Sequence, residues 1–430
     1  MRKNLVMAIL ITSLVIGLSS SVLATENVLD VWGFQLFTEE GDKWLKETIE
    51  QWGIDNNVKV LYQVVPASVM HQKLAAGFEA QDPPDLFMVQ GQFAQQYIGN
   101  NMTLNVDDVW QWMKAQGAYE MLEPLFFKDS KAFGIPVEID IAPYFFRKDL
   151  IEDAGYALDD VKTWEKLIEV LRETQDPPRI YGLGMPISRC ADSASSIEEF
   201  LWAFGAKLFD EEGNAALYSS EAVEAVEILD KMYNEWEIIP KGVLTWDDAG
   251  NNKIYQQWQA IAVRNPPSIY FYMVTEDPDL LKVTVALPPP SGPAGSFAAI
   301  DSWIWLVPKD TPFAEEVKGL LRYLYEPDRH KEIIDMVGGR WFPVYESLAD
   351  DPLWQEPFFE HYPEIVARGR VGGYAYHPTP AYGEIMKNYV LVDMVQKVII
   401  GEATAEEAVL EAHNIIQKTV DHYREIGEGQ

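Results

Sequence analysis

The sequence is poor in cysteine, which limits how the fold can be stabilised. Cys190 is the only cysteine among 430 residues, so the chain cannot form an internal disulfide. A lipoprotein signal needs a cysteine at its cleavage point, and the N-terminal region has none. We expect that the chain tolerates an oxidising compartment without depending on one for its stability.

Basic residues are also scarce. The chain has 34 Lys and Arg against 67 Asp and Glu, a formal net charge of −33. Such an acidic surface repels phosphate backbones and anionic lipids, which argues against nucleic acid and membrane surfaces as partners. It also weakly disfavours anionic ligands, although charge alone identifies no function.

Catalytic motifs are mostly absent. The chain has no G-x-S-x-G, H-E-x-x-H, C-x-x-C or P-loop motif, and its six histidines lack metal-ligand spacing. A lone G-x-G at Gly182 and Gly184 is too weak to indicate a nucleotide site. We therefore expect no cofactor and no metal. Because carboxylates are plentiful, a two-acid glycosidase mechanism is not excluded by counting.

The N-terminus predicts a signal peptide over residues 1–24. Arg2 and Lys3 form a basic region, residues 5–18 are apolar, and residues 22–24 form a small-residue cleavage site. No later segment is apolar for long enough to span a bilayer. We expect export to the periplasm without lipid attachment; a retained N-terminal anchor is the alternative.

What the chain does have is length and aromatic side chains. Its 430 residues suggest two or three compact units. The 14 Trp, 20 Tyr and 19 Phe exceed what ordinary cores require. The surplus could line a binding groove.

Strands and helices alternate at the start of the chain. Strands are predicted near residues 27–34, 58–65 and 84–90, with helices over residues 39–53 and 70–81. This βαβ order implies a parallel sheet, in which ligands collect at the carboxyl ends of the strands. Those ends are Trp32 to Phe34, Val65 to Ala67, and Gln90 to Gln92.

A second α/β region follows. Residues 160–174 predict a helix with Thr163 as N-cap, and residues 218–236 predict another that begins at Ser219 or Ser220. The C-terminal part of the chain is also predicted to be helical.

Between these helices the sequence favours extended chain. Residues 259–265 predict a short strand, and the prolines of residues 285–296 exclude a helix there. Residues 298–308, AAIDSWIWLVP, predict one strand with alternate side chains on the same face. That face carries Asp301, Trp303 and Trp305.

Two carboxylates interrupt the apolar segment GIPVEIDIAPYFF. Leaving an ionised carboxylate buried without a partner costs several kcal/mol, so we expect Glu138 and Asp140 to face a cleft or to meet polar partners. The alternatives are that they accept hydrogen bonds from backbone N–H groups, or form ion pairs with Arg147 or Lys148.

The order of several segments resembles family 1 extracellular solute-binding proteins, the receptors of carbohydrate ABC importers, which include maltose-type binding proteins. The resemblance covers nearly the whole chain after residue 24. The order of the matching segments is more specific than any single segment. The segments are FGIPVEIDIAPYFFRKDLIEDAG, KTWEKLIEVLRE, FGAKLFDEEGNAALYSSEAVEAVEILDKMY, QAIAV and VALPPPSGPAGSFAAIDSWIWLVPK.

The resemblance implies a type 2 periplasmic binding protein fold, with two parallel-sheet lobes joined by crossover hinge segments and a helical C-terminus. It places crossovers at PVEIDIA, at KVTVALPPP and near Tyr325 to His330. Lobe one would comprise residues 25–139 plus 288–326, and lobe two residues 140–287 plus 327–430. It also implies a carbohydrate ligand, a membrane permease as partner, a monomer and no enzymatic activity.

One departure limits the resemblance. The third strand is followed by Gln90-Gly91-Gln92, where maltose-type members tend to carry charged ligand contacts. Maltose is therefore not carried over as the ligand.

The candidate ligand contacts combine flat rings for the C–H faces of a sugar with polar groups for its hydroxyls. Packing on the sheet is the alternative for Trp32, packing between lobes for Trp341, and a surface ion pair for Arg264. The amides of Gln90 and Gln92 could instead satisfy backbone groups. The candidates are Trp32, Phe34, Gln90, Gln92, Glu138, Asp140, Arg264, Asn265, Asp301, Trp303, Trp341 and Tyr376.

Two further hypotheses stay open. A secreted glycoside hydrolase would use Glu138 or Asp140 with Asp301 as its acid pair. Alternatively, the receptor fold would bind a polyol, glycerol phosphate or a peptide.

Overall fold

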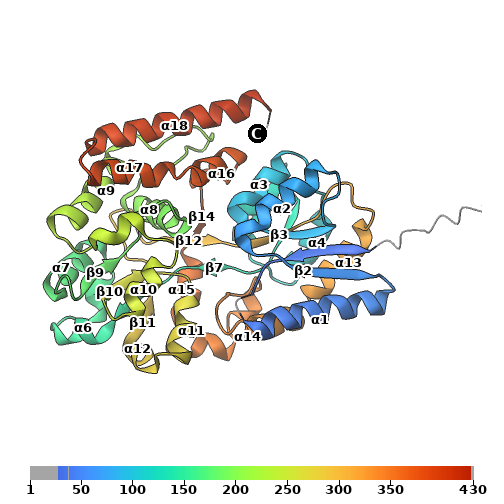
Figure 1. The fold of residues 1–430 in the computed structure, drawn as a ribbon, viewed down its shortest axis with the longest axis horizontal. Coiled ribbons are helices and arrows are strands. Elements are labelled where there is room, and N and C mark those ends of the chain that lie inside the picture. The colour runs from blue at the N-terminus through green and yellow to red at the C-terminus, as the bar shows by residue number, and fades with distance from the viewer. Residues whose placement is uncertain (1–27, 37, 428–430) are drawn as a thin grey trace, which may run out of the picture.

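The computed structural model describes residues 28–36 and 38–427, and two main sheets divide them into two lobes (Figure 1). The predicted signal peptide lies outside these residues. The first lobe is built on a five-stranded sheet in the order β2-β1-β3-β13-β6. Its strands are β1 (Leu29–Gly33), β2 (Val60–Val64), β3 (Leu86–Gln90), β6 (Gly134–Pro136) and β13 (Trp303–Leu306).

The predicted parallel pairing is confirmed for the first three strands of the first lobe. Strand β1 pairs in parallel with both β2 and β3, and helices α1 (Glu39–Asn56) and α2 (Ala67–Glu79) form the crossovers. The predicted helix over residues 39–53 is confirmed as α1, which buries an apolar stripe at Leu45, Ile49 and Trp52. Burial of this stripe removes apolar surface from water and fixes α1 on the sheet.

The second lobe is built on a four-stranded sheet in the order β11-β8-β10-β9. Strand β10 is parallel to β9 and antiparallel to β8. The strands are β8 (Tyr144–Arg147), β9 (Tyr181–Gly184), β10 (Ala260–Arg264) and β11 (Thr284–Leu287). The short strand predicted over residues 259–265 is thereby confirmed.

Helix caps in the second lobe follow the sequence. The Thr163 side chain accepts a hydrogen bond from the N–H of Lys166 at the start of α7 (Trp164–Thr174). Ser219 caps α9 (Ser220–Asp230) in the same way, which settles the choice between Ser219 and Ser220.

The helical C-terminus is also confirmed. The last helices cover one side of the second lobe, where α17 packs on α8 and α9, α18 packs on α9, and α16 packs on α18 (Figure 1). They are α16 (Pro380–Lys387), α17 (Val390–Ile399) and α18 (Ala405–Glu425), and α8 spans Ala191–Phe204.

The remaining elements are shorter or lie at the edges of the lobes. The helices are α3 (Gly91–Gly99), α4 (Asp107–Lys114), α5 (Glu123–Phe126), α6 (Lys148–Asp153), α10 (Gly250–Gln256), α11 (Ser268–Thr275), α12 (Pro278–Val283), α13 (Ala314–Leu324), α14 (Pro327–Met336) and α15 (Tyr362–Ala367). Strands β4 (Phe127–Lys128) and β5 (Lys131–Ala132) form a hairpin.

The prediction of a single strand over AAIDSWIWLVP is wrong. The segment forms two strands in different sheets, β12 (Ala298–Asp301) and β13, separated at Ser302. The Ser302 N–H donates to its neighbour Asp301 Oδ1 at 2.9 Å instead of to a ladder partner. Periodicity along one chain describes which face a side chain occupies, but it does not specify which sheet a strand joins.

A three-stranded central sheet, in the order β14-β12-β7, lies between the lobes (Figure 1). Strand β7 (Asp140–Ile141) follows β6 of the first lobe and precedes β8 of the second, while β12 lies between β11 and β13. The third strand is β14 (Gly369–Val371). The lobe boundaries given above stay a prediction, and α14, just after the third of them, packs on α1 of the first lobe.

Within the described residues, no helix combines the length and apolarity needed to cross a bilayer.

Candidate ligand-binding site

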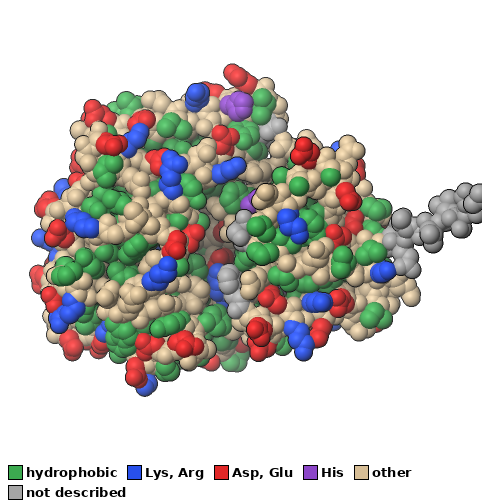
Figure 2. Space-filling view, viewed as in Figure 1, with side chains coloured by type: hydrophobic (Ala, Val, Ile, Leu, Met, Phe, Trp, Pro, Cys, Tyr) green, Lys and Arg blue, Asp and Glu red, His purple; other side chains and the backbone are tan. Residues whose placement is uncertain are grey.

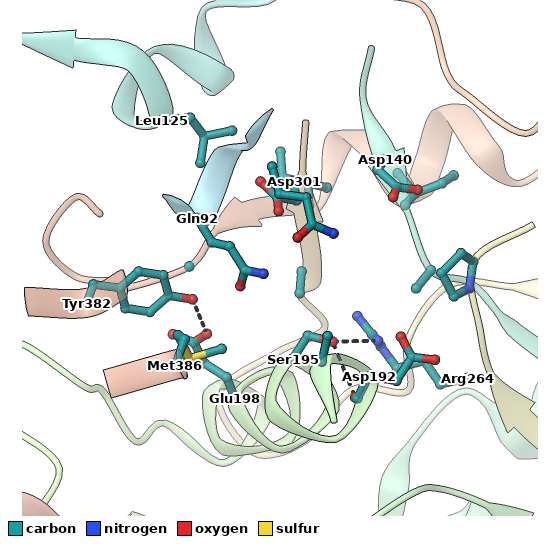
Figure 3. A pocket seen from close by; sticks show the side chains of 18 residues that line it. Gln92, Leu125, Asp140, Asp192, Ser195, Glu198, Arg264, Asp301, Tyr382 and Met386 are labelled. Carbon is teal, nitrogen blue, oxygen red and sulfur yellow. Dashed lines mark hydrogen bonds between the residues drawn. The ribbon is translucent and has the colours of Figure 1, made fainter. Parts of the chain in front are cut away.

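A cavity of about 140 Å³ lies between the two lobes. Figure 2 shows a hollow between the two halves, with acidic side chains inside it. Figure 3 shows how polar side chains from the two lobes converge on the cavity. The residues that line it are Gln90, Gln92, Leu125, Asp140, Ile141, Ala142, Ala191, Asp192, Ser195, Glu198, Arg264, Pro266, Ala299, Ile300, Asp301, Gly372, Tyr382 and Met386.

The first lobe contributes two amides from the junction of β3 and α3. Gln90 ends the strand and Gln92 lies in the first turn of the helix, with Gly91 between them. A Cβ atom at Gly91 would lie 2.4 Å from Asp301 Oδ1, so the close approach of these two segments requires glycine. Among the described residues, neither amide side chain has a hydrogen-bond partner, which leaves their donors and acceptors available to a ligand.

Asp301 stands beside these amides, at the point where the chain leaves the central sheet. Its pKa is raised to about 7 by burial, and the N–H groups of Ser302, Gln92 and Gly91 oppose this rise. Near neutral pH this carboxyl can therefore either donate or accept a hydrogen bond.

The second lobe contributes three polar side chains from one face of α8. Asp192 accepts a hydrogen bond from Asn251 Nδ2 at 2.9 Å, and burial raises its pKa to about 6. Ser195 and Glu198 follow at three-residue spacing, so the three side chains share the face of the helix that meets the cavity.

Glu198 fixes α8 against the segment that enters α16. Its two carboxylate oxygens accept hydrogen bonds from the Gly373 N–H at 2.9 Å and from the Tyr382 hydroxyl at 2.8 Å. Burial raises the pKa of Glu198 to about 7, and these two donors oppose the rise.

Arg264 ends β10 and lines the cavity, and its predicted ligand contact stays a prediction. Its Nε lies 3.0 Å from Glu199 Oε1, and both side chains are almost fully buried. Its Nη1 donates to Ser195 Oγ at 3.2 Å. The alternative of a surface ion pair is wrong, because both side chains are buried.

Asp140 lines the cavity from β7, while Glu138 does not. Asp140 Oδ1 accepts from Arg340 Nη1 at 2.8 Å. The proposed partner Arg147 pairs with Asp149 instead, so the alternative based on Arg147 or Lys148 is wrong.

Glu138 is fully buried and accepts a hydrogen bond from the Trp303 N–H at 2.9 Å. This confirms the alternative in which the carboxyl binds a backbone donor. Burial and the nearby Asp140 raise the pKa of Glu138 well above its usual range. A ligand contact for Glu138 stays a prediction.

The predicted aromatic contacts lie outside the cavity lining. The rings of Phe34 and Trp303 stack on each other with centroids 3.7 Å apart. The Trp32 indole donates to Asp30, with Lys73 above its ring.

The last three candidates are also engaged elsewhere. Trp341 is buried away from the cavity, Tyr376 stacks on His377, and Asn265 donates to the Pro266 carbonyl. A ligand contact stays a prediction for each of these three residues and for Trp32, Phe34 and Trp303.

The sequence interpretation missed the contributions of α8 and α16. Asp192, Ser195 and Glu198 recur every three residues along an otherwise apolar helix, and this spacing was the available signal. Tyr382 and Met386, four residues apart on α16, carry no comparable signal, because such residues are usual in cores.

No group of three or more His, Cys, Asp or Glu side chains in the described part of the chain is arranged to hold a metal ion.

Two lobes, a connecting central sheet and a polar cavity between the lobes define a two-lobe binding protein. Residues 46–360 match the family of bacterial extracellular solute-binding proteins, and the chain belongs to this family. The predicted family resemblance is thereby confirmed.

Named relatives agree with this assignment. The chain is 22% identical over 322 residues to an arabinooligosaccharide-binding protein of Halalkalibacterium halodurans. The aligned region covers 73% of this chain and 70% of the relative. It is 25% identical over 245 residues to the arabinooligosaccharide-binding protein of Bacillus subtilis, at 55% of each chain.

Solved structures share the fold. MalE3 of T. maritima, bound to maltose, superposes with a TM-score of 0.77 at 20% identity, over 91% of this chain and 99% of that one. A solute-binding protein of Thermotoga lettingae, bound to α-D-tagatose, gives a TM-score of 0.74 at 22% identity, again over 91% and 99%. The predicted two-lobe fold class is confirmed. The prediction that both lobes have parallel sheets is wrong, because β8 and β13 each pair antiparallel with both neighbouring strands, so both main sheets are mixed.

Proposed function

We propose that this protein is an extracytoplasmic receptor that binds a carbohydrate between its lobes and delivers it to the permease of an ABC importer. The observation that carries the proposal is that both lobes supply hydrogen-bonding walls to one cavity. Gln92 comes from the first lobe, and Glu198 and Arg264 come from the second. The names of the two arabinooligosaccharide-binding relatives support a carbohydrate as the ligand class.

The walls suit the hydroxyl groups of a carbohydrate. Carboxylates such as Asp140 accept hydrogen bonds from hydroxyls, and these charge-assisted bonds are stronger than neutral ones. The amides of Gln90 and Gln92 both donate and accept, while Arg264 only donates. Each hydroxyl, which is both donor and acceptor, can therefore be matched.

Delivery requires that the lobes respond to the ligand. A ligand that contacts both walls binds the closed form more tightly than the open form and so shifts the population toward closure. We propose that β7, β12 and β14 act as the hinge, because these strands lie between the two main sheets. This would place the third passage between lobes near residues 369–371 instead of the predicted Tyr325 to His330. Export through a signal peptide, absence of lipid attachment and a monomeric receptor belong to the same proposal.

The hydrolase hypothesis is tested with the same purified protein. Members of this family are binding proteins, and in this chain Glu138 is fully buried while Asp140 is held by Arg340. Incubation with carbohydrates should leave them uncleaved while raising the melting temperature, since a ligand that binds only the folded state stabilises it. Release of reducing ends would instead support the hydrolase.

A further inference from the structure

We propose that the ligand is a single sugar unit or a polyol of five or six carbons, and that the cavity between the lobes is too small for longer saccharides. This inference rests on the proposed receptor function and narrows its substrate class. The bound sugars of the structural neighbours range from one unit, in tagatose, to two, in maltose, so they leave the length open.

The first argument is volume. The cavity measures about 140 Å³. An engineered protein cavity of about 150 Å³ holds one benzene ring, whereas sites for drug-sized ligands span about 300–1,000 Å³. The cavity therefore fits one six-membered ring or an open chain of similar size.

The second argument is the wall between the cavity and the outer edge of the cleft. Helices α3 and α16 pack against each other there, and both Tyr382 and Met386 of α16 line the cavity. The backbones approach so closely that a Cβ atom at Gly383 would lie 3.1 Å from the Gln92 carbonyl oxygen. A second sugar unit in this direction would have to separate the two helices.

A larger groove of about 590 Å³ lies between α3 and residues 377–380. It shares no lining residue with the cavity. Gln95 helps to form the partition, because its amide donates to the carbonyls of Pro124 and Leu125, which lie on opposite sides of it. The groove is therefore not a continuation of the cavity in this conformation.

The third argument is the chemistry of the walls. Among the described residues, the only aromatic side chain in the lining is Tyr382, and its hydroxyl already donates a hydrogen bond to Glu198. Eight of the other 17 described lining residues carry polar side chains, so recognition relies on hydrogen bonds rather than on stacking along a chain of sugar rings. The polar lining side chains are Gln90, Gln92, Asp140, Asp192, Ser195, Glu198, Arg264 and Asp301.

The same walls argue for an uncharged ligand. The lining holds four carboxyl side chains against the single guanidinium of Arg264, whose charge is matched by Glu199. A phosphate or carboxylate on the ligand would meet repulsion without a free cation to compensate. Sugar phosphates and uronic acids should therefore be rejected.

Calorimetric titration of the purified chain tests the inference. The probes are pentoses, hexoses, pentitols and hexitols, with linear trisaccharides of the same sugars, a hexose phosphate and a uronic acid for comparison. At least one single-unit neutral probe should bind 100-fold or more tightly than every trisaccharide and every anionic probe. Tighter binding of a trisaccharide or an anion would overturn the inference but leave the receptor function intact. Binding of no carbohydrate would instead contradict the receptor function.

A pair of variants tests the wall. Met386→Ala should enlarge the cavity and reduce the preference for single units over disaccharides by tenfold or more. Met394→Ala is the matched control, because Met394 is also buried in the second lobe but does not line the cavity. If both variants keep the wild-type preference, or lose it equally, the wall does not set the length of the ligand.

Discussion

Arg264, in the cavity wall, forms a buried ion pair with Glu199, with 3.0 Å between Nε and Oε1 and side-chain exposures of 4% and 3%. The other oxygen of Glu199 accepts the Ala299 N–H at 2.8 Å, so the pair also connects α8 to the central sheet. The polar wall of the second lobe therefore depends on a charge pair that solvent does not screen.

Breaking this pair should destabilise the fold. Arg264→Met leaves the Glu199 carboxylate buried and unpaired, and the free energy of unfolding should fall by about 3–5 kcal/mol. Urea denaturation measures the change. Arg189→Met is the control, because its pair with Asp393 is largely exposed and its loss should be much smaller. If both variants lose the same free energy of unfolding, burial of the Arg264–Glu199 pair does not contribute to stability.

Glu138 should tolerate loss of its charge but not loss of its acceptor. Burial raises the pKa of Glu138 well above its usual range, so its site disfavours a charge and Glu138→Gln should be nearly neutral for stability. Glu138→Leu leaves the buried Trp303 N–H without its acceptor and should cost about 1–3 kcal/mol. Chemical denaturation at pH 7 measures both. A severe loss in the glutamine variant would show that the ionised form is required.

Glu198 should make stability depend on pH. Its pKa is about 7 in the folded protein and about 4.5 as an ordinary carboxyl. Between about pH 4.5 and 7 the Glu198 carboxyl holds a proton in the folded state but has lost it in the unfolded state. Its stabilising contribution is therefore fully present below about pH 4.5 and is lost as the pH rises through about 7. The wild type should therefore lose roughly 3 kcal/mol relative to Glu198→Gln from pH 4.5 to 8.

Unfolding free energies of the two proteins across this pH range supply the test. Glu227→Gln, at an exposed position of α9, should follow the wild-type profile. A Glu198→Gln profile parallel to that of the wild type would contradict the assigned pKa.

Gln92 should contribute to ligand binding and little to folding. Its amide has no hydrogen-bond partner among the described residues, so Gln92→Leu removes no internal bond. One lost hydrogen bond to the ligand should weaken binding by about 0.5–1.5 kcal/mol, or about two- to tenfold. Calorimetry with the ligand found above measures the loss, and the melting temperature without ligand should stay nearly unchanged. If this variant binds the ligand with wild-type affinity, Gln92 does not contact the ligand.

Local signals predicted much of the first lobe. The alternation of apolar segments placed β1, α1, β2, α2 and β3 correctly and led to Gln90 and Gln92, because strand ends at one edge of a parallel sheet meet in space. Arg264 was found by the same reasoning at the end of β10.

The rest depended on contacts between distant segments. Nothing local indicates that Ser302 divides two strands of different sheets, or that Arg340 is the partner of Asp140 from 200 positions away. The tryptophans show the same limit: aromatic rings suit sugar faces and cores equally well, and only the structure shows Trp303 stacked on Phe34.

Small-angle scattering of the purified protein with and without a saturating bound carbohydrate tests the central claim most directly, namely that both lobes hold one ligand in the cavity between them. The account predicts a smaller radius of gyration when the ligand is bound, because the ligand stabilises the form in which both walls contact it. A carbohydrate that saturates the protein while the radius of gyration stays unchanged would contradict it.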